Sequence, residues 1–266
     1  MSGCFSALRC PVCGGKMSAA GGALRCESGH AFDFAREGYV NLLRSNKPGN
    51  STGDSRRMAA ARRAFLENGC FSPLKDALGG YLAAADTAGA KCDICCGEGY
   101  YTSALGGGEV YAFDLSKEMV RLAAKRSQAT CFVANIAAIP LADESVGAAI
   151  HLFAPFHSRE FGRIMRPDGV LLTAVAGRRH LFAMKEIMYA HPYENDEKPP
   201  EADGFKTVDT LRVRSNAVIN GSANIAALLE MTPYGVHTPP DGKQRLISLD
   251  TLETELEFVV YVMKRV

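Results

Sequence analysis

The sequence contains no run of about 18 apolar residues, so it contains no candidate membrane-spanning helix. The first residues, Met1 to Phe5, also lack the basic and apolar regions of a signal peptide. Internal repeats and low-complexity tracts are absent as well. We therefore expect a cytoplasmic protein with no membrane partner. Its 266 residues, 47% of them hydrophobic, are enough to build a sizeable core.

The small formal net charge of +1 hides an uneven distribution along the chain. Residues 1–70 hold ten Lys and Arg against five Asp and Glu, whereas the rest of the chain holds 20 against 24. A basic first segment is typical of a contact with nucleic acid, although a solvated basic face gives the same composition. Composition alone does not separate these two interpretations.

Nine cysteines, an odd number at irregular spacings, do not fit a disulfide framework. Four residues in the pattern C-x2-C-x12-C-x3-H, namely Cys10, Cys13, Cys26 and His30, match a tetrahedral zinc site of the Cys3His type. Four protein ligands leave no open position, so such a site is structural and supplies folding free energy on the order of 10 kcal/mol. The alternative to a zinc site is that these cysteines are ordinary buried thiols or a redox pair. Cys4 lies outside the four-residue pattern.

Changes in composition divide the chain into three predicted segments. We expect a zinc-binding ribbon in residues 1–45, a linker and helical segment in residues 46–90, and an α/β domain in residues 91–266. Asp54 is placed to cap a helix that ends near Gly69. Its apolar face holds Met58, Ala61, Phe65 and Leu66, and its outer face holds Arg56, Arg57, Arg62 and Arg63.

Apolar strands alternate with helices from about residue 90, the order typical of a mostly parallel sheet. Strands are expected at 91–95, 109–113, 131–134, 146–153 and 170–175, with helices beginning near Gly99, Ser116 and Ser158. The alternating segment 252–262 predicts a late antiparallel strand on the same sheet. Residues 181–233 are irregular except for a strand-like stretch at 207–214, and we interpret them as an insertion over the edge of the sheet.

A glycine turn follows the first of these strands, in the run D-I-C-C-G-E-G-Y-Y-T. Gly97 and Gly99 allow the backbone to turn sharply against a ligand, and Asp93 and Asp114 stand at the ends of two successive strands. An acid at the second strand end has the spacing needed to accept hydrogen bonds from ribose hydroxyls, which favours a nucleoside ligand. Glycine for turn geometry alone is the alternative interpretation.

S-adenosylmethionine fits this turn better than a dinucleotide does. A dinucleotide site usually shows G-x-G-x-x-G/A, but Thr102 occupies the third position here and no second nucleotide half is evident. Asn135, after the third strand, is placed to pair with the adenine edge, although an ordinary turn residue explains it as well. The predicted fold class is therefore an α/β class I (Rossmann-like) methyltransferase with an N-terminal zinc ribbon.

Together these segments resemble the rRNA large-subunit methyltransferase A family, which methylates guanine N1 in 23S rRNA. The similarity spans nearly the whole chain and is most specific in E-G-Y-V-N-L-L and A-R-R-A-F-L. It also includes Ala154-Pro155, G-R-R-H-L at 177–181 and Met231-Thr232-Pro233-Tyr234. The resemblance implies a 23S rRNA hairpin loop as substrate, S-adenosylmethionine and zinc as cofactors, and a possible homodimer.

Carried over by position, the resemblance also implies cofactor contacts at Phe71, Gly97, Glu98 and His180 and an RNA-facing insertion near 181–233. Cys95 stands where the family usually has Gly, and Phe71 where Tyr is common, so those two contacts differ from the family pattern.

Two steps of the reaction point to further candidate residues. Arg56, Arg62 and Arg63, together with the zinc segment, are expected to bind phosphates. The proton on N1 must leave, and His180 or His157 are the candidates to accept it.

Two other functions remain compatible with the sequence. The first is methylation of a small molecule, which the zinc segment disfavours because small-molecule enzymes rarely need one. The second is a zinc-containing RNA-binding protein with a vestigial nucleotide site, which the intact Asp93, Gly97, Gly99 and Asp114 disfavour.

Overall fold

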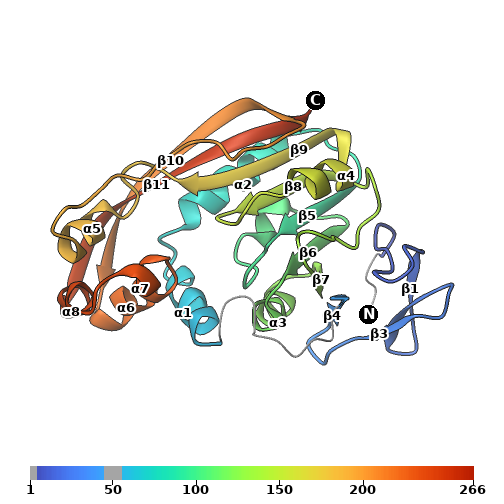
Figure 1. The fold of residues 1–266 in the computed structure, drawn as a ribbon, viewed down its shortest axis with the longest axis horizontal. Coiled ribbons are helices and arrows are strands. Elements are labelled where there is room, and N and C mark those ends of the chain that lie inside the picture. The colour runs from blue at the N-terminus through green and yellow to red at the C-terminus, as the bar shows by residue number, and fades with distance from the viewer. Residues whose placement is uncertain (1–4, 45–55) are drawn as a thin grey trace.

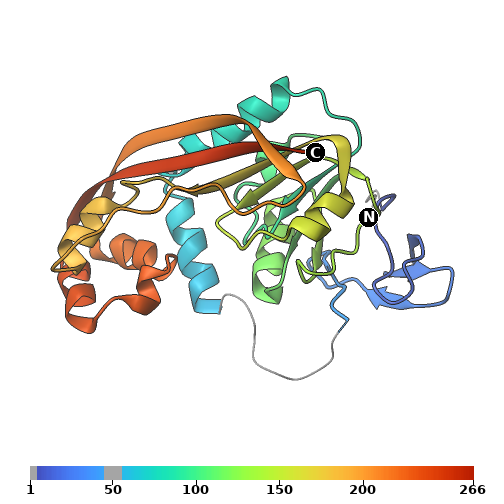
Figure 2. The ribbon, with the colours of Figure 1, turned by 45° about the horizontal axis from the view of Figure 1, so that its top comes forward.

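The computed structural model describes residues 5–44 and 56–266. Cys4, the cap predicted at Asp54 and most of the predicted linker lie outside these ranges. Figures 1 and 2 show a small ribbon at one end of the molecule, a group of short helices at the opposite end, and a large twisted sheet between them.

The N-terminal ribbon is a three-stranded antiparallel sheet formed by β1 (Met17–Ala20), β2 (Ala23–Cys26) and β3 (Ala31–Asp33). The chain then forms β4 (Val40–Asn41), which leaves the ribbon and adds a parallel edge strand to the large sheet beside β7. The sequence did not predict β4, because two residues are too short to show a periodic pattern.

The large sheet has eight strands in the order β10-β11-β9-β8-β5-β6-β7-β4. Its remaining strands are β5 (Ala90–Ile94), β6 (Val110–Asp114), β7 (Thr130–Val133), β8 (Val146–Leu152), β9 (Met165–Ala176), β10 (Phe205–Asn220) and β11 (Thr251–Arg265). Strands β5 to β9 are parallel, and β11 is antiparallel to both β9 and β10. The five predicted parallel strands and the late antiparallel strand are confirmed.

Helices flank this sheet and also form the group opposite the ribbon (Figure 1). They are α1 (Arg56–Leu66), α2 (Ser72–Ala84), α3 (Lys117–Arg126), α4 (Ser158–Ile164), α5 (Phe182–Met188), α6 (Ser222–Glu230), α7 (Tyr234–His237) and α8 (Pro240–Ile247). Ser116 caps α3, since its hydroxyl accepts a hydrogen bond from Met119 N at 3.4 Å. Within the described ranges, none of these helices has the length and apolar character needed to cross a bilayer.

Two predictions about local structure were wrong. The helix expected to begin near Gly99 is a short 3-10 helix, η1 (Thr102–Leu105), so the chain that directly follows the glycine turn forms no long helix in the described residues. Residues 181–233 are also more regular than predicted, because they contain α5, α6 and the 16-residue strand β10. Most of β10 is exposed at the sheet edge, so its sequence lacks the apolar run that marks a buried strand.

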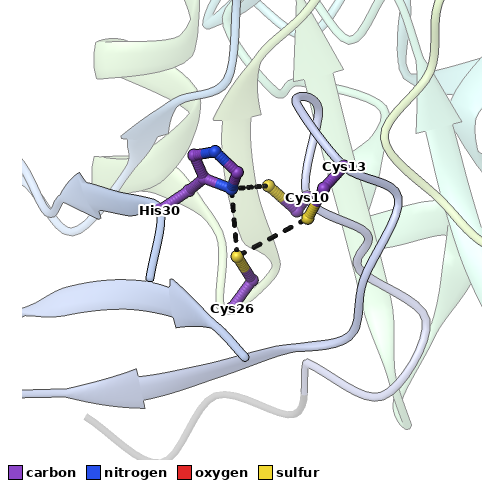
Figure 3. Close-up of side chains that lie close together, drawn as sticks. All are labelled: Cys10, Cys13, Cys26 and His30. Carbon is purple, nitrogen blue, oxygen red and sulfur yellow. Dashed lines mark hydrogen bonds between the residues drawn. The ribbon is translucent and has the colours of Figure 1, made fainter. Parts of the chain in front are cut away.

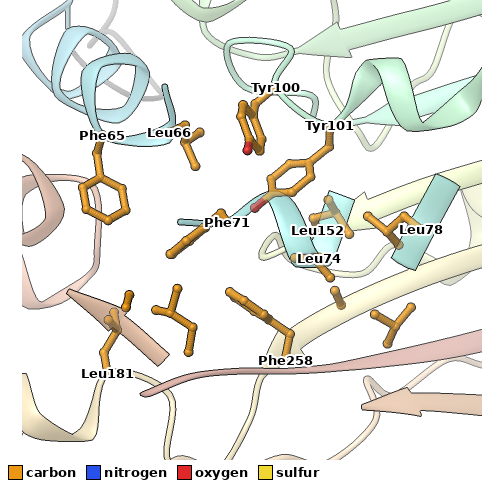
Figure 4. Close-up of a cluster of buried hydrophobic side chains, with 14 of the residues drawn as sticks. Phe65, Leu66, Phe71, Leu74, Leu78, Tyr100, Tyr101, Leu152, Leu181 and Phe258 are labelled. Atoms are coloured by element: carbon orange, nitrogen blue, oxygen red, sulfur yellow. The ribbon is translucent and has the colours of Figure 1, made fainter. Parts of the chain in front are cut away.

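Two large hydrophobic clusters form the core. One packs α1, α2, α5 and α6 against the sheet, and Figure 4 shows the part of it around Phe65, Phe71 and Phe258. The other joins residues of the ribbon, including Leu8 and Leu24, to Phe132 and Leu141 of the α/β domain. The ribbon is therefore packed against the sheet rather than tethered to it.

Candidate metal centre and cofactor cavity

The four predicted metal ligands lie together in the ribbon (Figure 3). His30 Nδ1 is 3.6 Å from Cys10 Sγ and 3.3 Å from Cys26 Sγ, and the Sγ atoms of Cys13 and Cys26 are 3.7 Å apart. Ligands at zinc bond lengths sit roughly 3.6–3.8 Å from one another on the edges of a tetrahedron. Three thiols and one imidazole at these separations fit zinc, with all four positions filled by protein.

Two tight turns bring the ligands together. Gly14 and Gly29 both adopt positive φ, at 73° and 85°, and each donates its N–H to the carbonyl of the cysteine that begins its turn. A backbone hydrogen bond from Gly15 and the Ser28 hydroxyl lower the pKa of Cys13 to about 6, which favours the thiolate that binds metal.

A cavity of about 730 Å³ lies at the carboxyl ends of the parallel strands, within the size range of ligand pockets. Seven of the eight predicted cofactor residues line it: Phe71, Asp93, Gly97, Glu98, Asp114, Asn135 and His180. Parallel strands bring residues that are distant in sequence to one edge of the sheet, where α/β proteins place their ligands. The remaining wall comes from α1, from the chain that follows β8 and β9, and from residues between Met231 and Val236, which include part of α7.

The glycine turn is held in place by Asp114. Its carboxylate accepts hydrogen bonds from Gly97 N at 3.0 Å and from Ser116 N at 2.8 Å. Gly97 adopts φ 54°, a conformation that glycine reaches at little cost. Cys95 adopts φ 59° at the position where the resemblance expects glycine, so a side chain occupies a strained point of the turn.

Gly99, the eighth predicted cofactor residue, is not among the residues lining the cavity. Its φ is 84°, and a Cβ there would lie 2.9 Å from the backbone of Ala123 in α3. Gly99 is thus required for close packing of the turn against α3. Asp93 does line the cavity and accepts a 2.6 Å hydrogen bond from the Thr102 hydroxyl. Burial raises the pKa of Asp93 to about 7.

Two buried polar groups in the cavity wall lack hydrogen bonds within the described part of the chain. Tyr101 Oη has no hydrogen-bond partner there, and neither does either carboxylate oxygen of Glu98. Glu98 forms an ion pair with Arg126, whose Nε lies 2.9 Å from Glu98 Oε2, but the angles do not make it a hydrogen bond. Burial raises the pKa of Glu98 to about 7 against the opposing effect of Arg126. Buried polar atoms of this kind are normally paired, so they fit a ligand with ammonium and carboxylate groups.

His180 also lines the cavity, and one hydrogen bond fixes its tautomer. The backbone N–H of Glu257 donates to His180 Nδ1 at 3.3 Å. The neutral ring therefore carries its proton on Nε2, which is a hydrogen-bond donor. Burial lowers the pKa of His180 to about 4, and the charge of Lys185 acts in the same direction. A histidine in this state offers its Nε2–H as a hydrogen-bond donor, and its role as acceptor of the N1 proton stays a prediction.

Glu257 supports this arrangement from behind His180. Its buried carboxylate accepts hydrogen bonds from Arg179 N at 2.9 Å, Arg214 Nε at 2.8 Å and Arg212 at 2.7 Å. Although burial acts to raise it, these contacts lower the pKa of Glu257 to about 2. A Cβ on Gly177 would lie 2.4 Å from Glu257 Cγ, so glycine is needed there for close approach.

The other candidate base, His157, lies elsewhere. Its Nδ1 accepts a 3.4 Å hydrogen bond from Glu160 N at the start of α4. It lines a second cavity, of about 790 Å³, between the ribbon and α4, and it does not line the first. The structure therefore contradicts a role for His157 as a base in the cofactor cavity.

The predicted RNA-binding arginines on α1 do not share one face. Arg56 is exposed and forms an ion pair with Glu118 at 3.4 Å, and Arg63 pairs with Glu67 at 3.1 Å. Arg62, predicted to lie outside, instead lines the cofactor cavity, and its guanidinium lies 3.5 Å from the Cβ position of Gly97. Helical periodicity did not predict this position, because it does not reveal that the glycine turn packs beside α1.

Phe71 and Asn135 each serve the fold as well as the cavity. The Phe71 ring packs edge-on against Phe65 and Phe258, at centroid distances of 5.5 and 5.2 Å. The Asn135 side chain accepts a hydrogen bond from Ala137 N at 2.9 Å, which agrees with the turn interpretation. Its amide NH2 group remains the part suited to a ligand.

Sequence reasoning missed several residues of the cavity wall, including Tyr101, Phe153 and Tyr234. Four non-glycine residues in the described ranges have positive φ, and three of them line the cavity: Cys95, Phe153 and Leu181. Strained backbone gathers at functional sites, which supports the assignment of this cavity. The motifs around Pro155 and Tyr234 were the available signal, but a motif alone does not show which side chains face a ligand.

Comparison with known proteins agrees with this geometry. A family model described as the N-terminal domain of RlmA matches residues 8–47, and one described as a methyltransferase domain matches residues 92–173. The chain is 33% identical to a 23S rRNA (guanine(748)-N(1))-methyltransferase of Streptomyces fradiae, over 91% of this chain and 90% of that protein.

Two further relatives are named provisionally for guanine-N1 methylation of 23S rRNA. One, from Micromonospora griseorubida, is 37% identical over 65% of this chain and 67% of its own length. The other, YxjB of Bacillus subtilis (strain 168), is 31% identical over 97% of both chains. With a matching ribbon, a matching catalytic domain and similarity along nearly its whole length, the chain belongs to the RlmA family of 23S rRNA (guanine-N1)-methyltransferases.

Proposed function

We propose that the protein transfers the methyl group of S-adenosylmethionine to N1 of a guanine in a hairpin loop of 23S rRNA. The cavity at the carboxyl edge of the sheet carries this proposal, in a chain that matches a relative named for this reaction over nearly its whole length. When bound, S-adenosylmethionine supplies a methyl group attached to a positively charged sulfur. The task of the protein is then to hold acceptor and donor in line.

The wall formed by β5, β6 and β7 offers groups that match each part of the cofactor. Glu98 and Tyr101 hold buried polar atoms that lack hydrogen bonds in the described ranges and suit the amino-acid portion. Asp114 lines the cavity, and its carboxylate oxygens are acceptors of the kind that ribose hydroxyls need. The amide of Asn135 is placed to contact adenine.

Guanine N1 lies on the Watson–Crick edge, so the base must be unpaired or extruded before it reaches the cavity. We assign His180, held with its Nε2–H available, the role of hydrogen-bond donor toward cofactor or base, and the N1 proton then leaves to solvent.

Basic groups around both cavities are suited to the RNA backbone. Arg56 and Arg63 lie on α1, and Arg62 lies at the cofactor cavity itself. Arg44 and Arg159 line the second cavity, between the ribbon and α4. RNA phosphates that bind in this second cavity would contact the ribbon close to its structural metal.

Methylation of a small molecule is the second candidate function. It shares the cofactor cavity, but it gives no reason for a metal-stabilised ribbon packed beside a groove lined with arginines. Incubation of the purified, zinc-loaded protein with labelled S-adenosylmethionine and 23S rRNA transcripts tests the choice. Label in the RNA is expected, and primer extension on rRNA from cells with and without the protein should locate one modified guanine. Unlabelled transcripts would refute the proposal.

Two finer points belong to the same proposal. We expect the reaction to take place in the cytoplasm, where ribosomal RNA is found in bacteria such as those that hold the relatives. We also expect two copies to pair as a homodimer around one RNA. Light scattering on the purified protein, with and without the hairpin, measures the second expectation.

A further inference from the structure

Phe153 is an unusual residue at the mouth of the cofactor cavity. It directly follows β8, adopts φ 56°, and leaves 50% of its surface exposed. The two other strained non-glycine residues in the cavity wall, Cys95 and Leu181, are half-buried and fully buried, respectively. Burial of the Leu181 side chain offsets the strain energy of its left-handed backbone. The half-exposed ring of Phe153 buries less surface and offsets less of that strain.

The surroundings hold Phe153 in this conformation. Its N–H donates to the carbonyl of Ala174 on β9 at 3.2 Å. Its ring is tilted by 55° against Phe258, at a centroid distance of 5.8 Å, and Phe258 in turn packs against Phe71 and His180. The buried members of this cluster, Phe71 and Phe258, are visible in Figure 4. An exposed aromatic ring is thus fixed on a rigid support at a ligand cavity.

The order of the strands indicates which ligand reaches this ring. Among the proposed cofactor contacts, Glu98, Asp114 and Asn135 follow β5, β6 and β7, whereas Phe153 follows β8, on the other side of β5. Strands lie about 4.8 Å apart, so the ends of β8 and β7 are separated by roughly 14 Å. The adenine beside Asn135 is therefore too distant to contact Phe153. The part of the cavity at the end of β8 is therefore left for the methyl acceptor.

A phenylalanine ring offers a flat apolar face and no hydrogen bond, so it recognises the face of a planar group. Base–aromatic stacking is the common way in which proteins hold an unstacked nucleotide. We propose that Phe153 is the platform on which the extruded guanine stacks, which fixes the plane of the base while its N1 edge faces the methyl donor. This inference rests on the proposed function and adds the residue that positions the acceptor.

A double-mutant cycle between the ring and the base tests the proposal. Once primer extension has located the modified guanine, two hairpins are made, one with that guanine and one with an abasic nucleotide in its place. Their dissociation constants are measured with the full-length zinc-loaded wild type and with Phe153→Ala, Phe153→Leu and Phe153→Tyr. The affinity of each protein for S-adenosylmethionine controls for folding, and Phe153→Gly removes the ring together with the backbone strain.

Phe153→Ala is expected to weaken binding of the guanine hairpin by about 10-fold to 100-fold and to leave binding of the abasic hairpin within about 2-fold. Phe153→Leu should lose most of this coupling, Phe153→Gly should resemble Ala, and Phe153→Tyr should keep it. Equal weakening of both hairpins, or a parallel loss of cofactor affinity, would overturn the inference while methylation of 23S rRNA continues. No methylation by the wild type would overturn the proposed function and this inference with it.

Discussion

The four ligands of the metal centre all lie between Cys10 and His30, on two tight turns, whereas the walls of the cofactor cavity come from residues as far apart as Met58 and Val236. The first site is local. Much of the folding free energy of the ribbon comes from the bound ion, because so short a segment cannot bury a core of its own. The second is non-local and exists only when the whole sheet has formed. Different perturbations should therefore damage the two sites separately.

Removal of a metal ligand should have the largest effect. Cys26→Ser is expected to abolish stoichiometric zinc binding and unfold the ribbon, because metal binding on the order of 10 kcal/mol is lost there. Metal analysis and thermal unfolding measure this result. The same variant should keep its affinity for S-adenosylmethionine within about 3-fold, because the two sites share no residue. This result would show that the two sites are separable. A variant that lost both together would break the comparison.

Gly177→Ala attacks the support of the cavity without touching the ribbon. The added methyl group would lie 2.4 Å from Glu257 Cγ, and the carboxylate is held by two arginines and cannot move freely. We expect a loss of about 3 kcal/mol in the free energy of unfolding, the upper end of the overpacking range. Urea unfolding measures it, and unchanged zinc content is the control. A neutral substitution would mean that the Glu257 network yields easily.

The pH dependence of stability should report on His180. Its folded-state pKa, about 4, is below the ordinary value of 6.5, so between these two values the unfolded chain binds a proton that the folded chain resists. Stability from this residue is complete above pH 6.5 and is lost as the pH falls toward 4, by about 2 kcal/mol at pH 5. Urea unfolding of the wild type and of His180→Gln at pH 7 and pH 5 isolates this contribution from those of other groups. Parallel losses in the two proteins would contradict it.

Cofactor affinity should change less than stability when His180 is replaced. Because one hydrogen bond to a ligand is worth about 1–1.5 kcal/mol, His180→Ala should weaken S-adenosylmethionine binding by roughly 10-fold. Turnover at saturating cofactor should fall less than affinity. Calorimetric titration and steady-state rates make the comparison. A large fall in turnover with unchanged cofactor affinity would instead indicate that His180 acts on the guanine during the reaction.

Cys95→Gly is expected to have the smallest effect. Glycine relieves the left-handed strain at φ 59°, but it also increases the freedom of the unfolded chain, so the net gain in stability should be under about 1 kcal/mol. The midpoint of urea unfolding measures this gain, with Cys95→Ala as the matched control that keeps the strain. Cofactor affinity measured alongside shows whether the thiol contributes to the cavity wall. Loss of stability would show that its packing outweighs the strain.

The same contrast explains what could be predicted from the sequence. The spacing of Cys10, Cys13, Cys26 and His30 defines a local geometry, and the structure brings these four together as expected. Strand-end residues such as Asp93 and Asp114 were also predictable, because parallel strands carry such positions to one edge.

The sequence was least informative where the position of a residue depends on packing between distant elements. Arg62 lines the cavity because α1 lies beside the glycine turn, and Gly99 is needed for close packing against α3. The tautomer of His180 depends on a backbone N–H from β11, 77 residues away in the sequence. No local pattern contains that information.

The two-residue strand β4 links the fates of the two regions. It follows the ribbon and covers the outer edge of β7 through parallel pairing. If chelation loosened the ribbon and withdrew β4, the bare amides and carbonyls of β7 would become available to strands of neighbouring molecules. Metal-starved molecules would then keep the cofactor cavity but associate with one another through this exposed edge, so the loss of zinc would appear as a larger assembly size.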